Sequence, residues 1–319
     1  MRLRHVARSA ALRGAALLLA LILLASCAMP PLEEGADAYY VFTDDTQSTV
    51  TLHEKPTRVA VLFSSFADVW KCAGGEVGIT VGESIERGFA STDAILVDSG
   101  AGKTVNTEAL LVADPDFVIC SADVASQVKA AELLREHGIA TACFRIESFE
   151  DYLRVLGICT DITGEEEKYR ENGIEVKERI DAMLSSVKEQ NRRTDILFVR
   201  ASATSVKAKS STEHFASLML SELGAHNIAD DTPLLIDGLG GEEILKRNPT
   251  HVFVSVMGSE EGAKEALDSN TVISSLEATQ NGRCHVLPKD LFQYKPNARW
   301  DEAYLYLIEL LYENFETNG

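Results

Sequence analysis

Positive charge is scarce in this chain. Its 319 residues include 30 Lys and Arg against 49 Asp and Glu, a net charge of −19. Four of the Arg and none of the acids lie in residues 1–27, so the remainder is more acidic still, with 26 basic and 49 acidic residues. Binding to nucleic acid requires a basic surface that neutralises phosphates. We therefore expect no nucleic-acid partner and no broad adhesion to anionic lipid.

Long hydrophobic runs are also lacking. The run Ala15–Leu24 is about half of the roughly 20 residues that a membrane-spanning helix needs. It is preceded by basic residues only, at Arg2, Arg4, Arg8 and Arg13, and followed by the small residues Ala25 and Ser26. This order is typical of a secretory signal peptide. We expect residues 1–27 to be removed and the protein to act outside the cytoplasm.

The end of this segment, Leu24-Ala25-Ser26-Cys27, resembles the bacterial lipobox, whose Cys is acylated and becomes the first residue of the mature protein. The resemblance implies lipidation at Cys27 and anchoring to the bacterial cell membrane, at the cell surface or in the periplasm. Residues 28–50 contain Pro and Glu with little apolar periodicity, which predicts a flexible tether. The alternative is an ordinary signal peptide with an incidental Cys. Because Ala28 follows Cys27, the type of envelope is left open.

Cysteines with metal-binding spacing are missing. Five remain besides Cys27, and no two form a C-x-x-C pair: Cys72, Cys120, Cys143, Cys159 and Cys284. Export permits disulfides, but an odd number leaves at least one thiol free. Cys120 and Cys143 lie in apolar runs, where Cys packs as a small hydrophobic residue. The pairing of these thiols is left open.

Catalytic motifs are absent too. No G-x-S-x-G, H-E-x-x-H or G-x-G-x-x-G stands in a suitable strand-helix setting. Residues 98–104 resemble a phosphate-binding loop, but Val97 stands where its first Gly is required. We expect a protein that is not an enzyme and has no resident cofactor. An exported hydrolase on an α/β scaffold is the alternative, because a fold alone does not determine function.

What the sequence does contain is a regular alternation of short apolar runs with amphipathic segments. Strands are expected at 59–63, 117–120, 141–145, 195–199, 251–257 and 284–287. Helices are expected at 66–73, 127–137, 149–160, 214–224, 242–246 and 298–315. Such alternation is typical of parallel sheets covered by helices on both faces. The fold class is therefore α/β, with two Rossmann-like lobes at 51–162 and 193–319, each around a mostly parallel sheet.

One segment between the lobes differs. Across residues 163–192 apolar side chains recur at helical spacing, at Tyr169, Val176, Ile180, Met183, Leu184 and Val187. Thr163 and Glu166 have the spacing of a capping box. The pattern predicts one long connecting helix, weakened slightly at Gly173.

Three stretches carry a family resemblance: Lys55–Val61, Thr107–Ile119 and Glu242–Pro249. In order and spacing they are similar to the periplasmic binding proteins of ABC importers for iron complexes, haem and cobalamin, in which a single helix connects two lobes. The resemblance covers about Lys55 to Phe315. It implies a monomeric receptor that captures a ferric siderophore, haem or corrinoid and delivers it to a permease with its ATPase subunits. A surface sensor that serves no permease is a further alternative.

In that family, one Glu near the start of a helix on each lobe pairs with Arg of the permease. The corresponding residues here are Glu108 and Glu242, each seven residues before a turn proline, Pro115 or Pro249. A carboxylate in a first helical turn is stabilised by the helix dipole, and an Arg partner would fix the docking orientation. Glu243 beside Glu242 makes the second assignment ambiguous.

Ligands of open α/β sheets bind beyond the carboxyl ends of strands. Aromatic and cationic side chains near those ends suit a large, partly apolar anion. The candidate ligand-binding residues are Ser65, Phe66, Trp70, Arg87, Arg200, Lys207, His214, Met257, Phe292, Tyr294 and Arg299.

His214 is also a candidate axial ligand of haem iron, because haem-binding relatives can supply a His from the start of this helix. Lys103, however, lies where some of those relatives have Met, so a Met-His pair is not expected. A bare metal ion is not expected either, since the first lobe has only His53 and His137.

Overall fold

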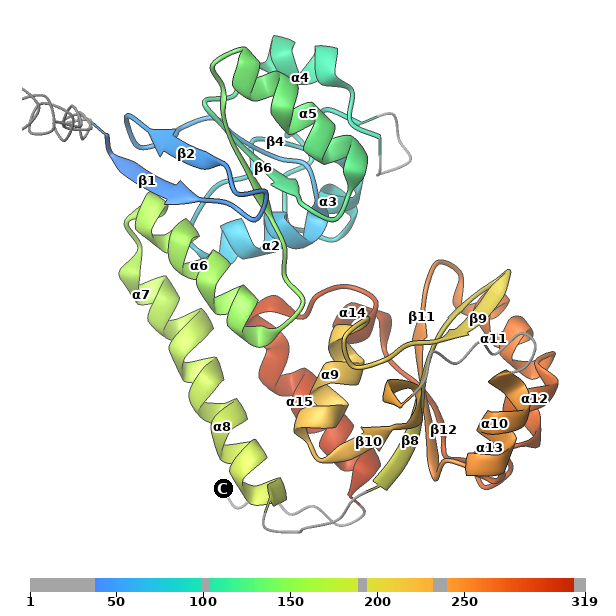
Figure 1. The fold of residues 1–319 in the computed structure, drawn as a ribbon. Helices are drawn as coiled ribbons and strands as arrows, with labels where there is room; N and C mark the ends of the chain where they lie inside the picture. Colours follow the sequence, from blue (N-terminus) through green and yellow to red (C-terminus); the bar gives the residue numbers. More distant parts are fainter. Residues whose placement is uncertain (1–37, 99–103, 189–193, 232–239, 313–319) are drawn as a thin grey trace, which may run out of the picture. The chain divides into compact units, whose positions relative to one another are not determined.

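Short apolar strands alternate with helices throughout the part of the chain that the computed structural model describes, residues 38–98, 104–188, 194–231 and 240–312 (Figure 1). The predicted α/β class with two largely parallel sheets is confirmed. Cys27 and the predicted signal peptide lie outside the described residues.

The N-terminal lobe is built on five parallel strands in the order β5-β4-β3-β6-β7. Their bounds are β3 Val59–Val61, β4 Ile79–Thr80, β5 Ile95–Leu96, β6 Phe117–Ser121 and β7 Ala140–Phe144. Every residue of β3 and β6 is buried, which explains why these strands appear in the sequence as unbroken apolar runs.

Helices cover both faces of this sheet because successive strand side chains point to opposite sides. Val59 and Val61 pack with α2 (Ser64–Cys72) and α6 (Phe149–Thr163). Ala60 and Leu62 pack instead with α4 (Thr107–Ala113) and α5 (Ala125–Glu136). The short helix α3 spans Gly82–Glu86.

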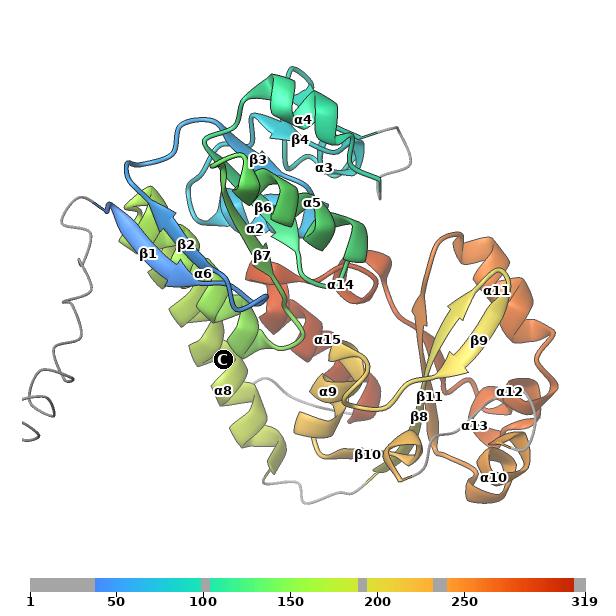
Figure 2. The same ribbon diagram turned by 45° about the horizontal axis from the view of Figure 1, so that its top comes forward.

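Part of the expected flexible tether is folded. Residues 40–52 form an antiparallel hairpin of β1 (Tyr40–Thr43) and β2 (Thr49–Leu52), which lies beside α6 and β7 (Figure 2). Asp44, in the turn, is 2% exposed and accepts hydrogen bonds from Thr46, Ser48, the Cys143 amide and Arg135. The two long-range bonds, from Cys143 and Arg135, cannot be read from the local composition, and they make residues 40–50 part of the lobe.

The connecting helix begins later than expected. Thr163 is the last residue of α6, its hydroxyl donates to the Ala73 carbonyl, and Gly164 ends the helix in the left-handed conformation with φ 73°. The predicted capping box at Thr163 is therefore wrong. Beyond it, helix runs without a gap through α7 (Glu166–Tyr169), a π-helical turn (170–174) and α8 (Glu175–Lys188). Gly173 lies in the π turn, where an added Cβ would come within 3.1 Å of Leu153.

The C-terminal lobe has the strand order β10-β8-β11-β12, all parallel, with β9 antiparallel on the end of β8. The bounds are β8 Thr194–Ser202, β9 Ser205–Ala208, β10 Ala225–Asn227, β11 His251–Val256 and β12 Cys284–Val286. The three strands expected here are β8, β11 and β12.

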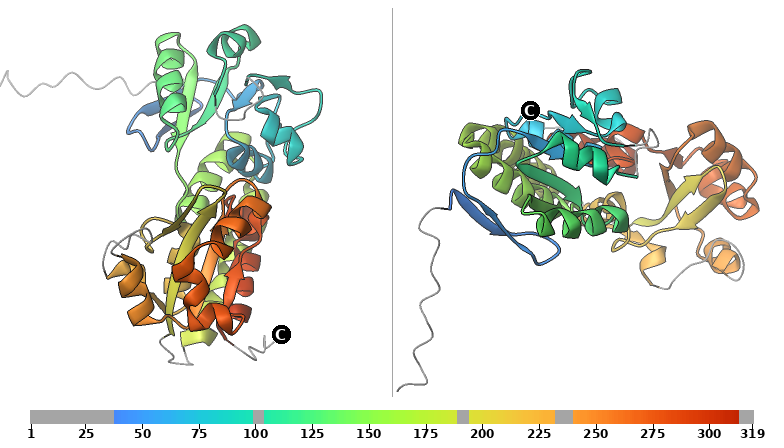
Figure 3. Two further views of the ribbon diagram at one scale, coloured as in Figure 1. Left: turned by 90° about the vertical axis from the view of Figure 1, so that its right-hand side faces the viewer. Right: turned by 90° about the horizontal axis from the view of Figure 1, so that it is seen from above.

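Two helical layers flank this sheet (Figure 3). On one face Phe198 packs with α9 (Phe215–Glu222) and α15 (Trp300–Leu311). On the other, Val199 packs with α10 (Gly240–Arg247), α11 (Glu260–Asp268), α12 (Thr271–Ser275) and α13 (Glu277–Gln280). Helix α14 (Lys289–Phe292) precedes the segment that leads back to the first lobe.

That returning segment joins the lobes through buried contacts. The Asn297 side chain donates to the Ser65 carbonyl at 2.9 Å and to Asp68 at 2.8 Å. Trp300 is fully buried, with its ring centroid 6.1 Å from Phe149 of α6 and 5.5 Å from Phe215 of α9. One apolar cluster therefore runs from one sheet to the other.

All five cysteines after Cys27 are free, and Cys120 and Cys143 are buried as expected. Among the described helices, none combines the length and hydrophobicity needed to cross a membrane.

The ion pair between Asp44 and Arg135, which we call the hairpin anchor, joins the β1–β2 hairpin to the lobe and predicts a stability effect. Replacing Asp44 by Ala should lower the free energy of unfolding by about 3–5 kcal/mol, because it leaves the partly buried Arg135 guanidinium unpaired. Urea denaturation would measure the change. The matched control is Asp181→Ala, which removes the exposed Lys177–Asp181 pair and should cost less than about 1 kcal/mol. Equal effects of the two substitutions would contradict the anchoring role.

Candidate functional site

A cavity of about 560 Å³ lies where loops of the two lobes meet. The N-terminal lobe contributes residues that follow β6 and β7, and the C-terminal lobe contributes Arg200 of β8, the start of α9 and the segment after α14. The lining residues are Asp123, Glu147, Ser148, Arg200, Ser211, Thr212, Glu213, His214, Phe215, Leu218, Gln293 and Lys295. This is the location expected for ligands of parallel sheets, beyond the carboxyl ends of the strands.

Two cations of the cavity lack counter-ions. Arg200 and Lys295 are partly buried, and neither forms an ion pair with any residue that the structure describes. The Arg200 Nε is buried without a hydrogen-bond partner among them, and burial lowers the pKa of its guanidinium. Burial also lowers the pKa of Lys295 to about 8. Because an unpaired buried cation is costly, this pair is suited to binding an anion.

The acids that line the cavity form no ion pair with these cations, although the charges of Glu147 and Asp123 act on Lys295 and partly oppose the lowering of its pKa by burial. Asp123 pairs with Arg145 at 2.5 Å, and Glu213 pairs with Lys209 at 3.2 Å. Glu147 is exposed and pairs with no described cation. The cavity thus has a cationic wall on the C-terminal lobe and a free acid on the N-terminal lobe.

His214 caps α9. Its Nδ1 accepts the Ala216 amide hydrogen at 3.2 Å, and its ring lies 4.7 Å from the Phe198 ring and 4.9 Å from the Phe215 ring. Burial, with nearby cations, lowers the pKa of His214 to about 3. The imidazole is therefore neutral with its proton on Nε2, where it can act as a donor.

The candidates in the N-terminal lobe do not line this cavity. Ser65, Phe66 and Trp70 are buried on the inner face of α2, where Phe66 packs on Phe144 and the Trp70 indole donates to the Glu76 carbonyl. Arg87 stacks on Tyr294 at 3.8 Å, and so these two candidates form a contact between the lobes.

Of the candidates in the C-terminal lobe, Arg200 and His214 line the cavity. Phe292 is fully buried, and Arg299 pairs with Asp290 and Glu302. Lys207 and Met257 are exposed and do not line the cavity, although Lys207 lies opposite Arg200 in the β8–β9 pair. Lys295 and Gln293 were not among the candidates, although they flank Tyr294, which was.

Glu108 and Glu242 are exposed in the first turns of α4 and α10, and neither pairs with a described cation. Both helices are anchored by one fully buried residue, Leu110 or Ile244. Both end at a left-handed residue before proline, at Asp114 with φ 51° and Asn248 with φ 44°. Glu243, in contrast, faces Arg247 at 3.8 Å.

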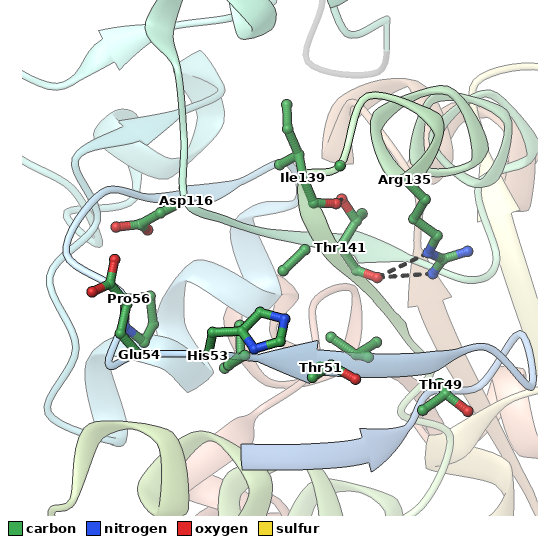
Figure 4. A pocket seen from close by; sticks show the side chains of 13 residues that line it. Thr49, Thr51, His53, Glu54, Pro56, Asp116, Arg135, Ile139 and Thr141 are labelled. Atoms are coloured by element: carbon green, nitrogen blue, oxygen red, sulfur yellow. Dashed lines mark hydrogen bonds between the residues drawn. The ribbon is translucent and has the colours of Figure 1, made fainter. Parts of the chain in front are cut away.

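A second hollow of about 350 Å³ lies between β2 and the edge of β7 (Figure 4). Its cation, Arg135, donates to the Thr141 carbonyl and pairs with Asp44. With its charge already neutralised, Arg135 is a structural residue of the hairpin anchor. Within the described ranges, no group of three His, Cys, Asp or Glu is placed to hold a metal ion.

The lowered pKa of Lys295 predicts the direction in which the stability of the protein changes with pH. Between pH 8 and the ordinary pKa of 10.5, the unfolded chain keeps a proton that the folded chain has lost. Stability must therefore rise with pH over this interval, relative to a Lys295→Met variant that cannot titrate. Urea denaturation of both proteins at pH 7, 8, 9 and 10 would measure it. A constant difference between them would show that Lys295 titrates normally.

Residues 59–291, well over half of the chain, match the family described as periplasmic binding protein. No curated protein matches the sequence. Among solved structures, the catecholate-siderophore binding protein VctP of Vibrio cholerae has a TM-score of 0.67 at 15% identity, covering 84% of this chain and 98% of its own. Staphylococcus aureus SirA, complexed with staphyloferrin B, has a TM-score of 0.62 at 18% identity, with coverage of 86% and 97%.

The periplasmic haem-binding protein RhuT of Roseiflexus sp. RS-1 has a TM-score of 0.64 at 14% identity, covering 80% of this chain and 98% of its own. At such identities these likenesses establish the fold alone, whereas the family match covers most of both lobes and every cavity-lining residue except Gln293 and Lys295. The chain belongs to the periplasmic binding protein family, as its motifs predicted.

Proposed function

We propose that this protein is the substrate-binding lipoprotein of an ABC importer, which captures an iron complex or a corrinoid outside the cytoplasm and delivers it to the permease. The observation that carries the proposal is the cavity between the lobes, with Arg200 and Lys295 held there without counter-ions. The stability that these cations cost is explained if a ligand supplies the missing negative charge.

The relatives support the ligand class. Three solved structures with this fold are a catecholate-siderophore binding protein, a protein complexed with staphyloferrin B and a haem-binding protein. Acylation at Cys27 would keep such a receptor beside its permease, and the exposed Glu108 and Glu242 would contact the permease. A sensor without a permease would not need two exposed acids on matching helices.

A ligand screen tests the receptor role. The chain from Asp37 onward should be stabilised by at least one member of a set of ferric siderophores, haem and cobalamin, and not by simple metal ions. A ligand at 100 times its Kd adds about 2.7 kcal/mol to the free energy of unfolding. Thermal unfolding would detect the gain and absorbance would confirm binding of coloured ligands. If no complex of the three classes binds, the proposed ligand class is refuted.

Charge reversal tests the docking role. Glu108→Lys combined with Glu242→Lys should abolish uptake by cells while leaving ligand affinity within about twofold of the original, because both acids lie outside the cavity lining. Uptake of radiolabelled iron complex and calorimetry of the purified protein would measure the two effects. The matched control is Glu132→Lys, an exposed acid on α5, which should leave uptake intact. Normal uptake by the double variant would refute docking through these residues.

A further inference from the structure

The described walls of the cavity are polar. Of the twelve lining residues that the structure describes, only Phe215 and Leu218 are apolar, and both come from α9. Pockets for flat macrocycles such as haem or corrin need broad hydrophobic walls against the ring faces. Two neighbouring apolar side chains cannot provide such walls on opposite sides of a ring.

The aromatic rings near the cavity are already in contact with other side chains of the protein. Phe215 is 5% exposed, packs against Trp300 and His214, and has the Lys295 Nζ 4.5 Å from its ring centroid. Tyr294 is occupied by Arg87. No described ring of the lining is therefore free to stack on a macrocycle or a catechol.

His214 is not prepared to coordinate iron. The Ala216 amide occupies the Nδ1 lone pair, so the ring proton resides on Nε2. Coordination through Nε2 would require loss of that proton, and coordination through Nδ1 would require loss of the helix cap. In the present geometry the imidazole offers a hydrogen bond and no lone pair.

The remaining polar groups fit oxygen atoms. Arg200, Lys295 and His214 are donors on the C-terminal lobe, and Ser211 adds a hydroxyl. The Gln293 Oε1 is buried without a described partner, and it can accept from a ligand hydroxyl. Glu147, the free acid on the opposite wall, would repel an anion and so favours binding with the negative groups toward Arg200 and Lys295.

Within the proposed receptor function, we infer that the cavity takes a hydrophilic ferric chelate of the hydroxycarboxylate class, with its carboxylates against Arg200 and Lys295 and a hydroxyl at Gln293. A chelator of this class wraps the metal in hard oxygen ligands, so no protein side chain needs to reach the iron. The inference excludes haem and corrinoids as the physiological cargo of this cavity.

Calorimetry on the full chain in lipid nanodiscs, with empty nanodiscs as the blank, tests the inference with ferric citrate, haemin and cyanocobalamin. Ferric citrate should bind and the two macrocycles should not. Arg200→Met and Lys295→Met should each lower the affinity for ferric citrate about 10- to 100-fold, which is the range for loss of a hydrogen bond to a charged group. Met replaces the unbranched stem of Lys or Arg by a flexible apolar side chain and removes a partly buried charge, so both variants should fold.

Lys264→Met is the matched control, because it removes an exposed cation of the same lobe, on α11, outside the cavity lining. It should leave the affinity unchanged, and Glu147→Gln should leave it unchanged or raise it. Binding of haemin or cyanocobalamin without ferric citrate would overturn the inference while sustaining the receptor function. Equal affinities in Arg200→Met, Lys295→Met and Lys264→Met would also overturn it. If no iron complex and no corrinoid bound to the protein, the proposed receptor function itself would be refuted.

Discussion

The packing of Trp300 between Phe149 and Phe215 is the contact on which the two-lobed arrangement depends. The indole is fully buried and continues the hydrophobic core of one sheet into that of the other. A side chain of this size contributes on the order of 3–5 kcal/mol when it fills a core site. The ion pair between Arg179 of α8 and Asp301, at 2.6 Å, adds a second link between the connecting helix and α15.

This junction also accounts for the charges in the cavity. Phe215 packs against Trp300 and, on the cavity side, against Lys295, so the core contact that holds α9 also supports a cation of the site. Arg200 projects from β8, whose neighbours in the strand are buried. Arg200 is thus held by a strand of the sheet and Lys295 by its contact with a core aromatic ring, so a ligand has less to order on binding. Functional sites commonly retain such locally unfavourable groups, which the rest of the fold compensates.

The sequence predicted the strands that are buried throughout, β3 and β6, and β11, which is buried after His251, because these leave nearly unbroken apolar runs. It could not predict β4 and β5, which have two residues each. It also missed the β1–β2 hairpin, since Asp44 is held by Arg135, 91 residues away, rather than by any local pattern.

The site was predicted in part for a similar reason. The carboxyl-end rule located Arg200, which follows a recognisable run of strand residues, and the family resemblance located His214 at the start of α9. The rule gives no side-chain direction, and so it could not show that Phe66 and Trp70 lie on the inner face of α2. Tyr294 and Lys295 are adjacent, yet one contacts Arg87 and the other Phe215, a divergence set by tertiary packing.

The hydrogen bond between Asn297 and Ser65 joins residues 232 positions apart. The first lobe therefore cannot complete its packing against Trp300 until nearly the whole chain has been synthesised. Contacts of such long sequence separation close late, because the entropy of the intervening loop must be lost first. Folding of the N-terminal lobe is in this way coupled to the arrival of the C-terminus, and a chain cut short before Asn297 would expose apolar surface on α2 and α6. Chaperones and proteases would recognise this exposed surface on an incomplete chain. Such a chain would consequently be removed before one lobe could persist without the other.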